Sequence, residues 1–270
     1  MLSDVTIGQF FPGKSVVHRC DPRMKICLVI FSIVLIFVAR NFLSLAAVIG
    51  FILLSVILSR VPVKLYLKSL KPILFILIFT AGLNIFYGTG DPIWQYGFLR
   101  ITMNGILNSI FISIRIISLI LASCVLTFTT SPTQLTDGIE RLLKPLTYLR
   151  VPVHEFAMTM TIALRFVPTL LEETDKIMSA QKARGADMES GGIIQRIRAL
   201  IPVLIPLFIS AFRRAFDLAT AMESRCYHGG EGRTKMKILK ISGIDFVILV
   251  MTGLMFAGFL VLNIMFPSAM

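Results

Sequence analysis

Five long runs of apolar residues divide the chain, and they decide what it can fold into. A helix that spans a membrane needs roughly 20 predominantly apolar residues. Five segments reach or approach that length: Ile26–Ala39, Phe42–Leu58, Pro72–Tyr87, Ile106–Phe128 and Gly243–Phe266. The chain is 56% hydrophobic, above the roughly 45–50% apolar content of soluble domains. The sequence therefore predicts an all-α integral membrane protein with about five transmembrane helices.

Basic residues beside these runs predict how the chain is oriented. The formal net charge is +12 although only 16% of the residues are charged. Lysines and arginines gather in residues 1–25 and again between the second and third runs, at Arg60, Lys64, Lys68 and Lys71. Cytoplasmic loops carry an excess of these residues, so both regions are predicted to be cytoplasmic. The N-terminus is then expected inside the cell and the C-terminus outside.

The pattern of charge changes after the fourth run. Residues 131–240 contain 16 lysines or arginines and 11 acidic residues. The expected organisation is a cytoplasmic N-terminal segment (1–25), four transmembrane helices (26–130), a cytoplasmic or interfacial domain of long amphipathic helices (131–240) and a last transmembrane helix (241–270).

Helical periodicity is clear within residues 131–240. Apolar residues at steps of four, three and four predict an interfacial or partner-binding helix; they are Leu135, Ile139, Leu142 and Leu146. Two longer helical tracts are expected over residues 164–186 and 206–226, with a turn at Gly191-Gly192. Prolines interrupt the apolar parts of these tracts. They are interpreted as kinked helices against the membrane, and a sixth or seventh span is the alternative.

Each of the two tracts ends with an arginine between two small residues. The motifs are Ala183-Arg184-Gly185 and Ser224-Arg225-Cys226. One interpretation is purely structural, since an arginine near a helix C-terminus is favourable by about 0.3–1 kcal/mol. The other is that each arginine enters a groove of a partner, because its planar guanidinium makes several directional hydrogen bonds. Two such tips suit a pair of similar subunits, such as a dimer of ATPases.

Other motifs indicate less. Gly8–Ser15 matches the phosphate-loop pattern, but no strand precedes it and no helix clearly follows, so nucleotide binding is not expected. The three histidines are scattered, and the sequence predicts no catalytic residue, no cofactor, no metal site and no nucleic-acid binding. Arg115, in the middle of the fourth run, is expected to face another helix of the bundle or a partner rather than lipid.

The chain resembles the T subunits of energy-coupling factor (ECF) transporters, of the type shared by several S subunits. The N-terminal part of the resemblance is Pro12-Gly13-Lys14-Ser15, His18-Arg19 and Asp21-Pro22-Arg23-Met24-Lys25. The later part covers Ala163–Ala186 and Ser210–Tyr227, which look like the family's coupling helices. Ala183-Arg184-Gly185 has the common form of the family motif, whereas Ser224-Arg225-Cys226 keeps the arginine with changed neighbours.

The resemblance implies a prokaryotic cell-membrane scaffold that is not itself an enzyme. Arg184 and Arg225, with the small residues beside them, would bind two cytoplasmic ABC-type ATPase subunits. The remaining coupling helices would hold one of several interchangeable membrane S subunits that bind vitamins. A stand-alone secondary transporter is the alternative, and it should carry acidic residues at mid-membrane depth and inverted repeats. A membrane-embedded enzyme would need clustered His, Asp, Glu or Cys.

Overall fold

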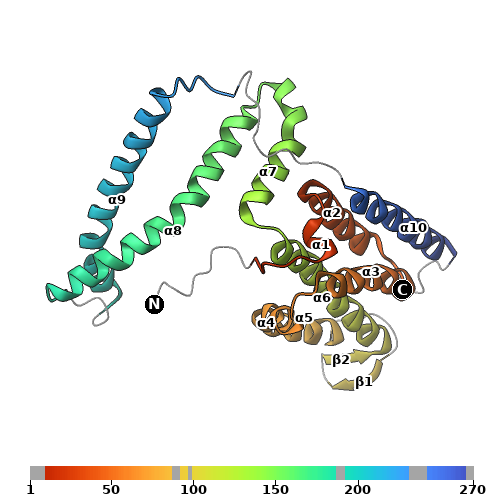
Figure 1. The fold of residues 1–270 in the computed structure, drawn as a ribbon. Helices are drawn as coiled ribbons and strands as arrows, with labels where there is room; N and C mark the ends of the chain where they lie inside the picture. The colour runs from red at the N-terminus through yellow and green to blue at the C-terminus, as the bar shows by residue number, and fades with distance from the viewer. Residues whose placement is uncertain (1–9, 87–91, 97–98, 187–191, 231–241, 266–270) are drawn as a thin grey trace. The chain divides into compact units, whose positions relative to one another are not determined.

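The computed structural model describes residues 10–86, 92–96, 99–186, 192–230 and 242–265, which are mostly helical (Figure 1). The chain divides into two compact units. One, here called the bundle, is built from Gln9–Gly138 and Leu239–Met270. The other, here called the arm, is built from Ile139–Ile238.

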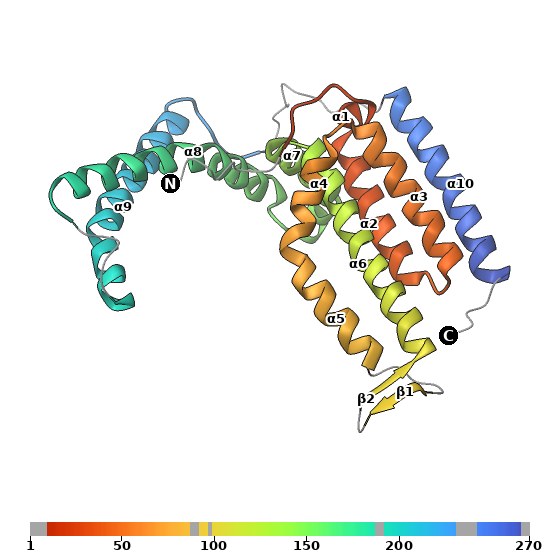
Figure 2. The same ribbon diagram turned by 90° about the horizontal axis from the view of Figure 1, so that it is seen from below.

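The bundle is organised around its longest helix, α6 (Met103–Thr129), which packs against α2, α3 and α5 (Figure 2). Helix α10 packs against α3. The remaining elements of the bundle are α1 (Val16–Arg19), α2 (Pro22–Val38), α3 (Phe42–Ser59), α4 (Val63–Leu70), the 3-10 helix η1 (Lys71–Ile73), α5 (Leu74–Phe86), β1 (Pro92–Tyr96), β2 (Leu99–Thr102) and α10 (Gly243–Met265).

Local sequence explains where α2 and α6 begin. The Asp21 side chain accepts the backbone N–H of Arg23, and Pro22 occupies the first turn of α2, where a missing N–H costs nothing. At α6 the hydroxyl of Thr102 accepts the N–H of Gly105 at 3.0 Å. A Cβ at Gly105 would lie 2.9 Å from the carbonyl oxygen of Ile85, so this glycine lets α6 approach the end of α5.

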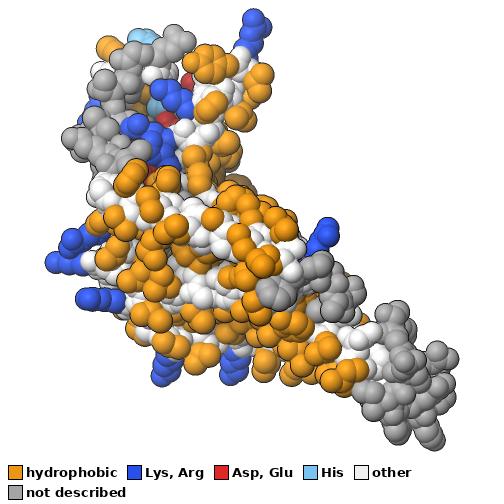
Figure 3. Space-filling model, turned by 90° about the vertical axis from the view of Figure 1, so that its right-hand side faces the viewer, with side chains coloured by type: hydrophobic (Ala, Val, Ile, Leu, Met, Phe, Trp, Pro, Cys, Tyr) orange, Lys and Arg blue, Asp and Glu red, His pale blue; other side chains and the backbone are white. Residues whose placement is uncertain are grey.

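Two apolar clusters hold the bundle together. The larger one joins α2, α3, α6 and α10, and its buried members are Leu35, Ile36, Ala39, Leu45, Val48, Ile52, Phe111, Ala122 and Phe259. In the smaller one, Tyr66 of α4 meets Phe128 of α6 edge to face, with ring centroids 5.1 Å apart. The outer surface is also apolar: Figure 3 shows hydrophobic side chains over most of the face that carries α10. A bilayer is the solvent that such a surface requires.

Within the described residues, five helical segments are long and apolar enough to cross a membrane: Phe42–Ser59, Val63–Phe86, Met103–Thr129, Ile194–Glu223 and Gly243–Met265. The predicted fold class, an all-α membrane protein, is confirmed. The set differs from the predicted one in two places. Helix α2 has 17 residues and is not among the five, and α9 is among them by length and composition.

Three local expectations were wrong. The basic stretch between the second and third apolar runs contains α4, an amphipathic helix with Val63 and Leu67 exposed, where a loop was expected. The stretch before α6, also expected to be a loop, contains an antiparallel pair, β1 and β2. Leu146 lies in a 3-10 helix after the end of α7, because Pro145 cannot continue the α-helical hydrogen bonding.

The arm consists mainly of two helices of 31 residues each, α8 (Val153–Ala183) and α9 (Ile193–Glu223). They follow the 3-10 helix η2 (Lys144–Leu149) and the end of α7 (Pro132–Leu143). Both helices begin well before the predicted tracts of residues 164–186 and 206–226, and both continue through prolines. Helices α8 and α9 run in opposite directions and cross (Figures 1 and 2), with Gln181 against Pro202 and Glu173 against Ser210.

Candidate partner-binding site at the ends of the arm helices

The two arginine motifs end their helices with the same hydrogen bonds. After α8, the N–H of Gly185 donates to the carbonyl of Lys182 and that of Ala186 to the carbonyl of Gln181, both at 3.0 Å. After α9, the N–H of Cys226 donates to Glu223 at 2.9 Å and that of Tyr227 to Met222 at 3.0 Å. These paired bonds define a Schellman motif.

The residue that closes each motif has a left-handed backbone. Gly185 has φ 85° and Cys226 has φ 54°. Arg184 and Arg225 each come directly before that residue, so they occupy the same position in two identical helix endings. Glycine adopts the left-handed region without strain, whereas a residue with a Cβ is destabilised there by roughly 1–2 kcal/mol. The changed neighbour in the second motif therefore preserves the backbone geometry.

All six residues of the two motifs are exposed. The two arginines lie far apart on the arm. Gln181, three residues before Arg184, contacts Pro202, and from Pro202 to Arg225 a helix rises about 35 Å at 1.5 Å per residue. The predicted site residues thus form two separate tips, and they do not converge on one pocket.

Arg225 lines a groove of about 940 Å³ with both apolar and charged side chains. The groove lies between the end of α9, η2 and the start of α8. Its basic side chains are Arg141, Lys144, Arg150 and Arg225, and its acidic ones are Glu140 and Glu155. The hydroxyl of Tyr227 donates to the sulfur of Met158 at 2.9 Å, which fixes the chain beyond the second motif. The excess of cations favours an acidic partner segment near Arg225.

A charged contact fixes the crossing of α8 and α9. The Glu173 carboxylate accepts hydrogen bonds from the Ser210 hydroxyl and, at 2.8 Å, from the Arg214 guanidinium. The Ser210 hydrogen bond, followed by that of Arg214, lowers the pKa of Glu173, so this side chain is charged at neutral pH. This contact sets how the two tips are arranged, and no local sequence pattern predicted it.

The N-terminal stretch that carries the family resemblance, Pro12–Lys25, is here called the N-terminal signature, and two of its residues form a buried polar cluster with Asp245 in the bundle. Asp21, Lys25 and Asp245 are at most 5% exposed. The Lys25 ammonium donates to the backbone carbonyls of Thr129 at 2.9 Å and His18 at 3.3 Å. Asp245, at the start of α10, accepts the backbone N–H of Asp21. The signature therefore ties α2, the end of α6 and the start of α10 together.

The stretch that resembles a phosphate loop has another role in the described residues from Phe10 onward. The hydroxyl of Ser15 caps α1, which has only four residues, and lies 2.7 Å from Nδ1 of His18. A Cβ at Gly13 would come within 2.8 Å of the His18 ring. Gly13 and Ser15 thus form a tight turn that packs around the imidazole of His18.

The Arg115 side chain makes its contacts with other residues of the bundle. Its guanidinium donates to the carbonyl of Ala39 at 2.8 Å, just after α2 ends, and lies 4.7 Å from the centre of the Phe111 ring. A cation at a helix C-terminus and over an aromatic face is favourable in both contacts. Of the two interpretations of Arg115, these contacts support the structural one. Among the described residues, no three His, Cys, Asp or Glu side chains are grouped to hold a metal ion.

Comparison with known proteins gives the family. The model of the CbiQ family, described as cobalt transport protein, matches residues 13–236. The energy-coupling factor transporter transmembrane protein EcfT of Ruminiclostridium cellulolyticum is 53% identical over 248 residues, which are 92% of this chain and 93% of that protein. The protein of the same description from Acidaminococcus fermentans is 50% identical over 262 residues, covering 97% and 96% of the two chains.

The corresponding protein of Bacillus subtilis is 47% identical over 252 residues, covering 93% and 95% of the two chains. The resemblance to the ECF transporters is thereby confirmed over nearly the whole length of the chain. The chain belongs to the CbiQ family and is a multi-pass transmembrane component of an energy-coupling factor transporter.

Proposed function

We propose that this chain transmits movement from two cytoplasmic ABC-type ATPase subunits to a membrane S subunit that binds a vitamin. The observation that carries the proposal is the pair of identical helix endings, each presenting an exposed arginine. In this proposal Arg184 and Arg225 each insert into a groove on one ATPase, and the small residues beside them, Ala183 with Gly185 and Ser224 with Cys226, let the groove close around the tip. The chain supplies neither ATPase activity nor a vitamin pocket.

The geometry of the endings suits this task. A left-handed residue directly after each arginine ends the helix, so nothing of the helix continues past the guanidinium. A rigid helix tip also loses little conformational freedom on binding, which favours affinity. A separation of about 35 Å along α9 gives each arginine its own socket, as a pair of similar subunits would provide.

An uncovered apolar face on α9 supports a membrane-embedded partner. Six of its large apolar side chains recur at steps of three and four and are 46–76% exposed; they are Ile194, Ile197, Ile201, Ile205, Phe208 and Phe212. A contiguous apolar face of this kind requires lipid or a partner protein to cover it. We assign it to one of several interchangeable S subunits.

The proposed orientation follows from the basic residues. Residues 1–25 lie on the cytoplasmic side of the cell membrane, and residues 131–240 lie on that side or at its membrane interface. The spans fall within 26–130 and 241–270, and the C-terminus is outside. The support is the basic stretch with Arg60, Lys64 and Lys68, since the positive-inside rule counts such residues near the membrane.

Charge reversal tests the two tips. Arg184→Glu and Arg225→Glu are each expected to weaken co-purification of the ATPase subunits and vitamin uptake by at least about tenfold, as loss of a buried charge-assisted contact of more than 1.4 kcal/mol would do. Arg196→Glu, an exposed arginine in the first turn of α9, is the matched control and should change neither. Normal uptake by both single variants and the double variant would disprove the assignment.

A second experiment separates the proposal from a stand-alone secondary transporter. The chain is reconstituted alone in liposomes and then together with the ATPases and one S subunit. Vitamin uptake is expected only in the second preparation and only with ATP. Solute transport by the chain alone would refute the coupling role.

A further inference from the structure

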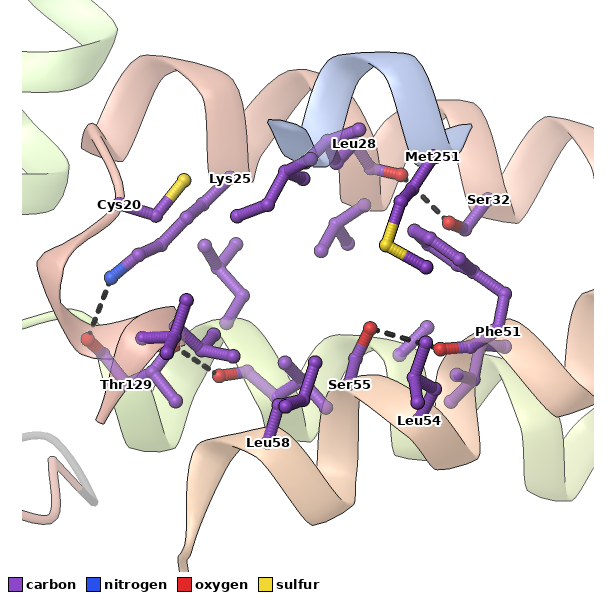
Figure 4. A pocket seen from close by; sticks show the side chains of 18 residues that line it. Cys20, Lys25, Leu28, Ser32, Phe51, Leu54, Ser55, Leu58, Thr129 and Met251 are labelled. Carbon is purple, nitrogen blue, oxygen red and sulfur yellow. Dashed lines mark hydrogen bonds between the residues drawn. The ribbon is translucent and has the colours of Figure 1, made fainter. Parts of the chain in front are cut away.

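An apolar slot of about 100 Å³ opens in the bundle between α2, α3, α6 and α10 (Figure 4). Leu28, Leu54, Leu58 and Met251 contribute most of the apolar side chains that Figure 4 labels around it. The slot lies between the buried cluster of Asp21, Lys25 and Asp245 and the larger apolar core with Phe259. Helix α10 packs against α3, and its residues Ile248 and Met251 line one side of the slot.

The polar side chains around the slot are turned to other partners. The hydroxyls of Ser32 and Ser55 donate to carbonyls of their own helices, at 2.8 and 2.9 Å, and Thr129 does the same at 2.6 Å. The Lys25 ammonium donates to the carbonyl of Thr129, as Figure 4 also shows. The Lys25 ammonium also donates to the His18 carbonyl and to the Thr130 hydroxyl. The hydrogens of all these donors are therefore in use, and the slot is apolar in its chemistry.

Water is a poor occupant of such a space. A buried water requires two to four polar partners, whereas an apolar cavity of roughly 150 Å³ in another protein stays dry and binds benzene. An empty cavity of this size would itself be destabilising, because the side chains that line it lose their packing contacts. An apolar occupant resolves both difficulties.

The rim of the slot shows where such an occupant enters. Leu54 and Leu58 of α3 are 37% and 41% exposed, and Met251 of α10 is 43% exposed. The opening therefore lies on the outer surface of the bundle, in the apolar belt that faces the bilayer. The apolar groups that a bilayer offers at such a surface are unbranched hydrocarbon chains.

We propose that this slot binds the end of one acyl chain of a membrane phospholipid, which packs between α10 and the pair α2 and α3. The acyl chain fills the space that the side chains of α2, α3 and α6 leave beside Met251 of α10. The site takes a hydrocarbon chain and is independent of the headgroup, because no charged side chain lies free at its rim in the part of the bundle that is described.

Photocrosslinking in the complete transporter tests the proposal. The complex with its ATPases and one S subunit is placed in nanodiscs that contain a phosphatidylcholine with a diazirine at the end of one acyl chain. After irradiation, adducts mapped by mass spectrometry are expected on Leu28, Ser55 and Met251. Ile57, which is 72% exposed on α3 outside the slot, should be labelled as the general lipid contact.

Filling the slot should remove the specific adducts. In Ser55→Leu the added side chain occupies the slot, and no buried donor is left without a partner because Ser55 bonds only its own helix. Adducts on Leu28 and Met251 should fall severalfold while those on Ile57 persist. Ser55→Val is a smaller second variant, and Leu53→Phe, which adds volume outside the slot, is the matched control with unchanged labelling.

Three results would overturn the proposal. The first is labelling of Ile57 without labelling of the slot residues in the unmodified complex. The second is unchanged labelling in both Ser55 variants. The third is slot labelling that appears only when the S subunit is omitted, which would show that a partner side chain, and not lipid, fills the slot in the working transporter.

Discussion

The carboxylate of Asp245 accepts the backbone N–H of Asp21 at 2.8 Å, joining two residues that lie 224 positions apart. Its second oxygen accepts the N–H of Ser242 at 2.7 Å and so caps the start of α10. One buried side chain therefore begins the last helix and attaches it to the N-terminal signature. Asp21 and Lys25 of the signature each bond a residue far away in the sequence, Asp245 and Thr129 respectively. These residues therefore serve the packing of the bundle and not catalysis.

Removing the Asp245 carboxylate should destabilise the bundle. Asp245→Ala leaves the buried N–H of Asp21 without a partner, which costs about 1–3 kcal/mol, and it also removes the cap on the N–H of Ser242. The expected result is a clearly lower midpoint of thermal unfolding for the purified transporter. Asp245→Asn keeps one acceptor oxygen, so its midpoint of thermal unfolding should lie between those of the unmodified protein and Asp245→Ala. Asp217→Ala, an exposed acidic residue on α9, is the control and should leave the midpoint unchanged.

Hydropathy predicted the membrane class because the length and apolar character of a spanning helix are properties of one continuous stretch of sequence. The buried cluster at Asp245 was not predictable in the same way, since pairing residues 224 positions apart depends on tertiary packing. The start of α2 had a local signal, Asp followed by Pro. The β1 and β2 pair also had one, since aromatic and β-branched residues such as Ile93 and Trp94 favour strands.

The candidate site also combines features that have a local sequence signal with features that depend on tertiary packing. The twin arginine motifs were visible in the sequence because a helix ending is set by a few neighbouring residues. The groove around Arg225 and the contact of Glu173 with Arg214 were not visible, because they depend on how α8 and α9 cross. That crossing brings together residues 41 positions apart, and no local pattern specifies it.

The two helix endings should respond to substitution in opposite directions. Gly185→Ala places a Cβ at φ 85° and should destabilise the end of α8 by about 1 kcal/mol. Cys226→Gly relieves the same strain at φ 54° and should stabilise the end of α9 by a similar amount. Hydrogen exchange of peptides that contain Ala186 and Tyr227 would measure both effects. Faster exchange after Cys226→Gly would contradict the left-handed assignment.

Close packing of α6 on α5 makes Gly105 sensitive to any side chain. In Gly105→Ala the added Cβ would lie 2.9 Å from the carbonyl of Ile85, and a backbone oxygen in a helix cannot easily move aside. Overpacking of this kind costs about 1–3 kcal/mol. Gly82→Ala on α5, where nothing lies within 4 Å, is the matched control. Thermal unfolding of the two variants in the same detergent should differ clearly, and equal midpoints would show that α5 and α6 are not in close contact.

Thiol labelling gives a direct test of whether the second tip is covered by a partner. Cys226 is exposed beside Arg225, whereas Cys20 is 3% exposed. Burial, assisted by the neighbouring Asp245, raises the pKa of the Cys20 thiol to about 12. Because maleimides react with the thiolate, Cys20 should stay unlabelled between pH 7 and about pH 9 until the protein is denatured.

A variant that retains Cys20 and Cys226, with Cys27 and Cys124 replaced by alanine, isolates the comparison. In membrane vesicles with the cytoplasmic face outward, Cys226 should react readily with a charged maleimide when the ATPases are absent. Bound ATPases should slow that reaction by at least about tenfold if Arg225 lies in their groove, since the thiol follows the arginine directly. The Arg225→Glu change should restore fast labelling with the ATPases present. Equal labelling rates with and without ATPases would place the second tip outside the partner interface.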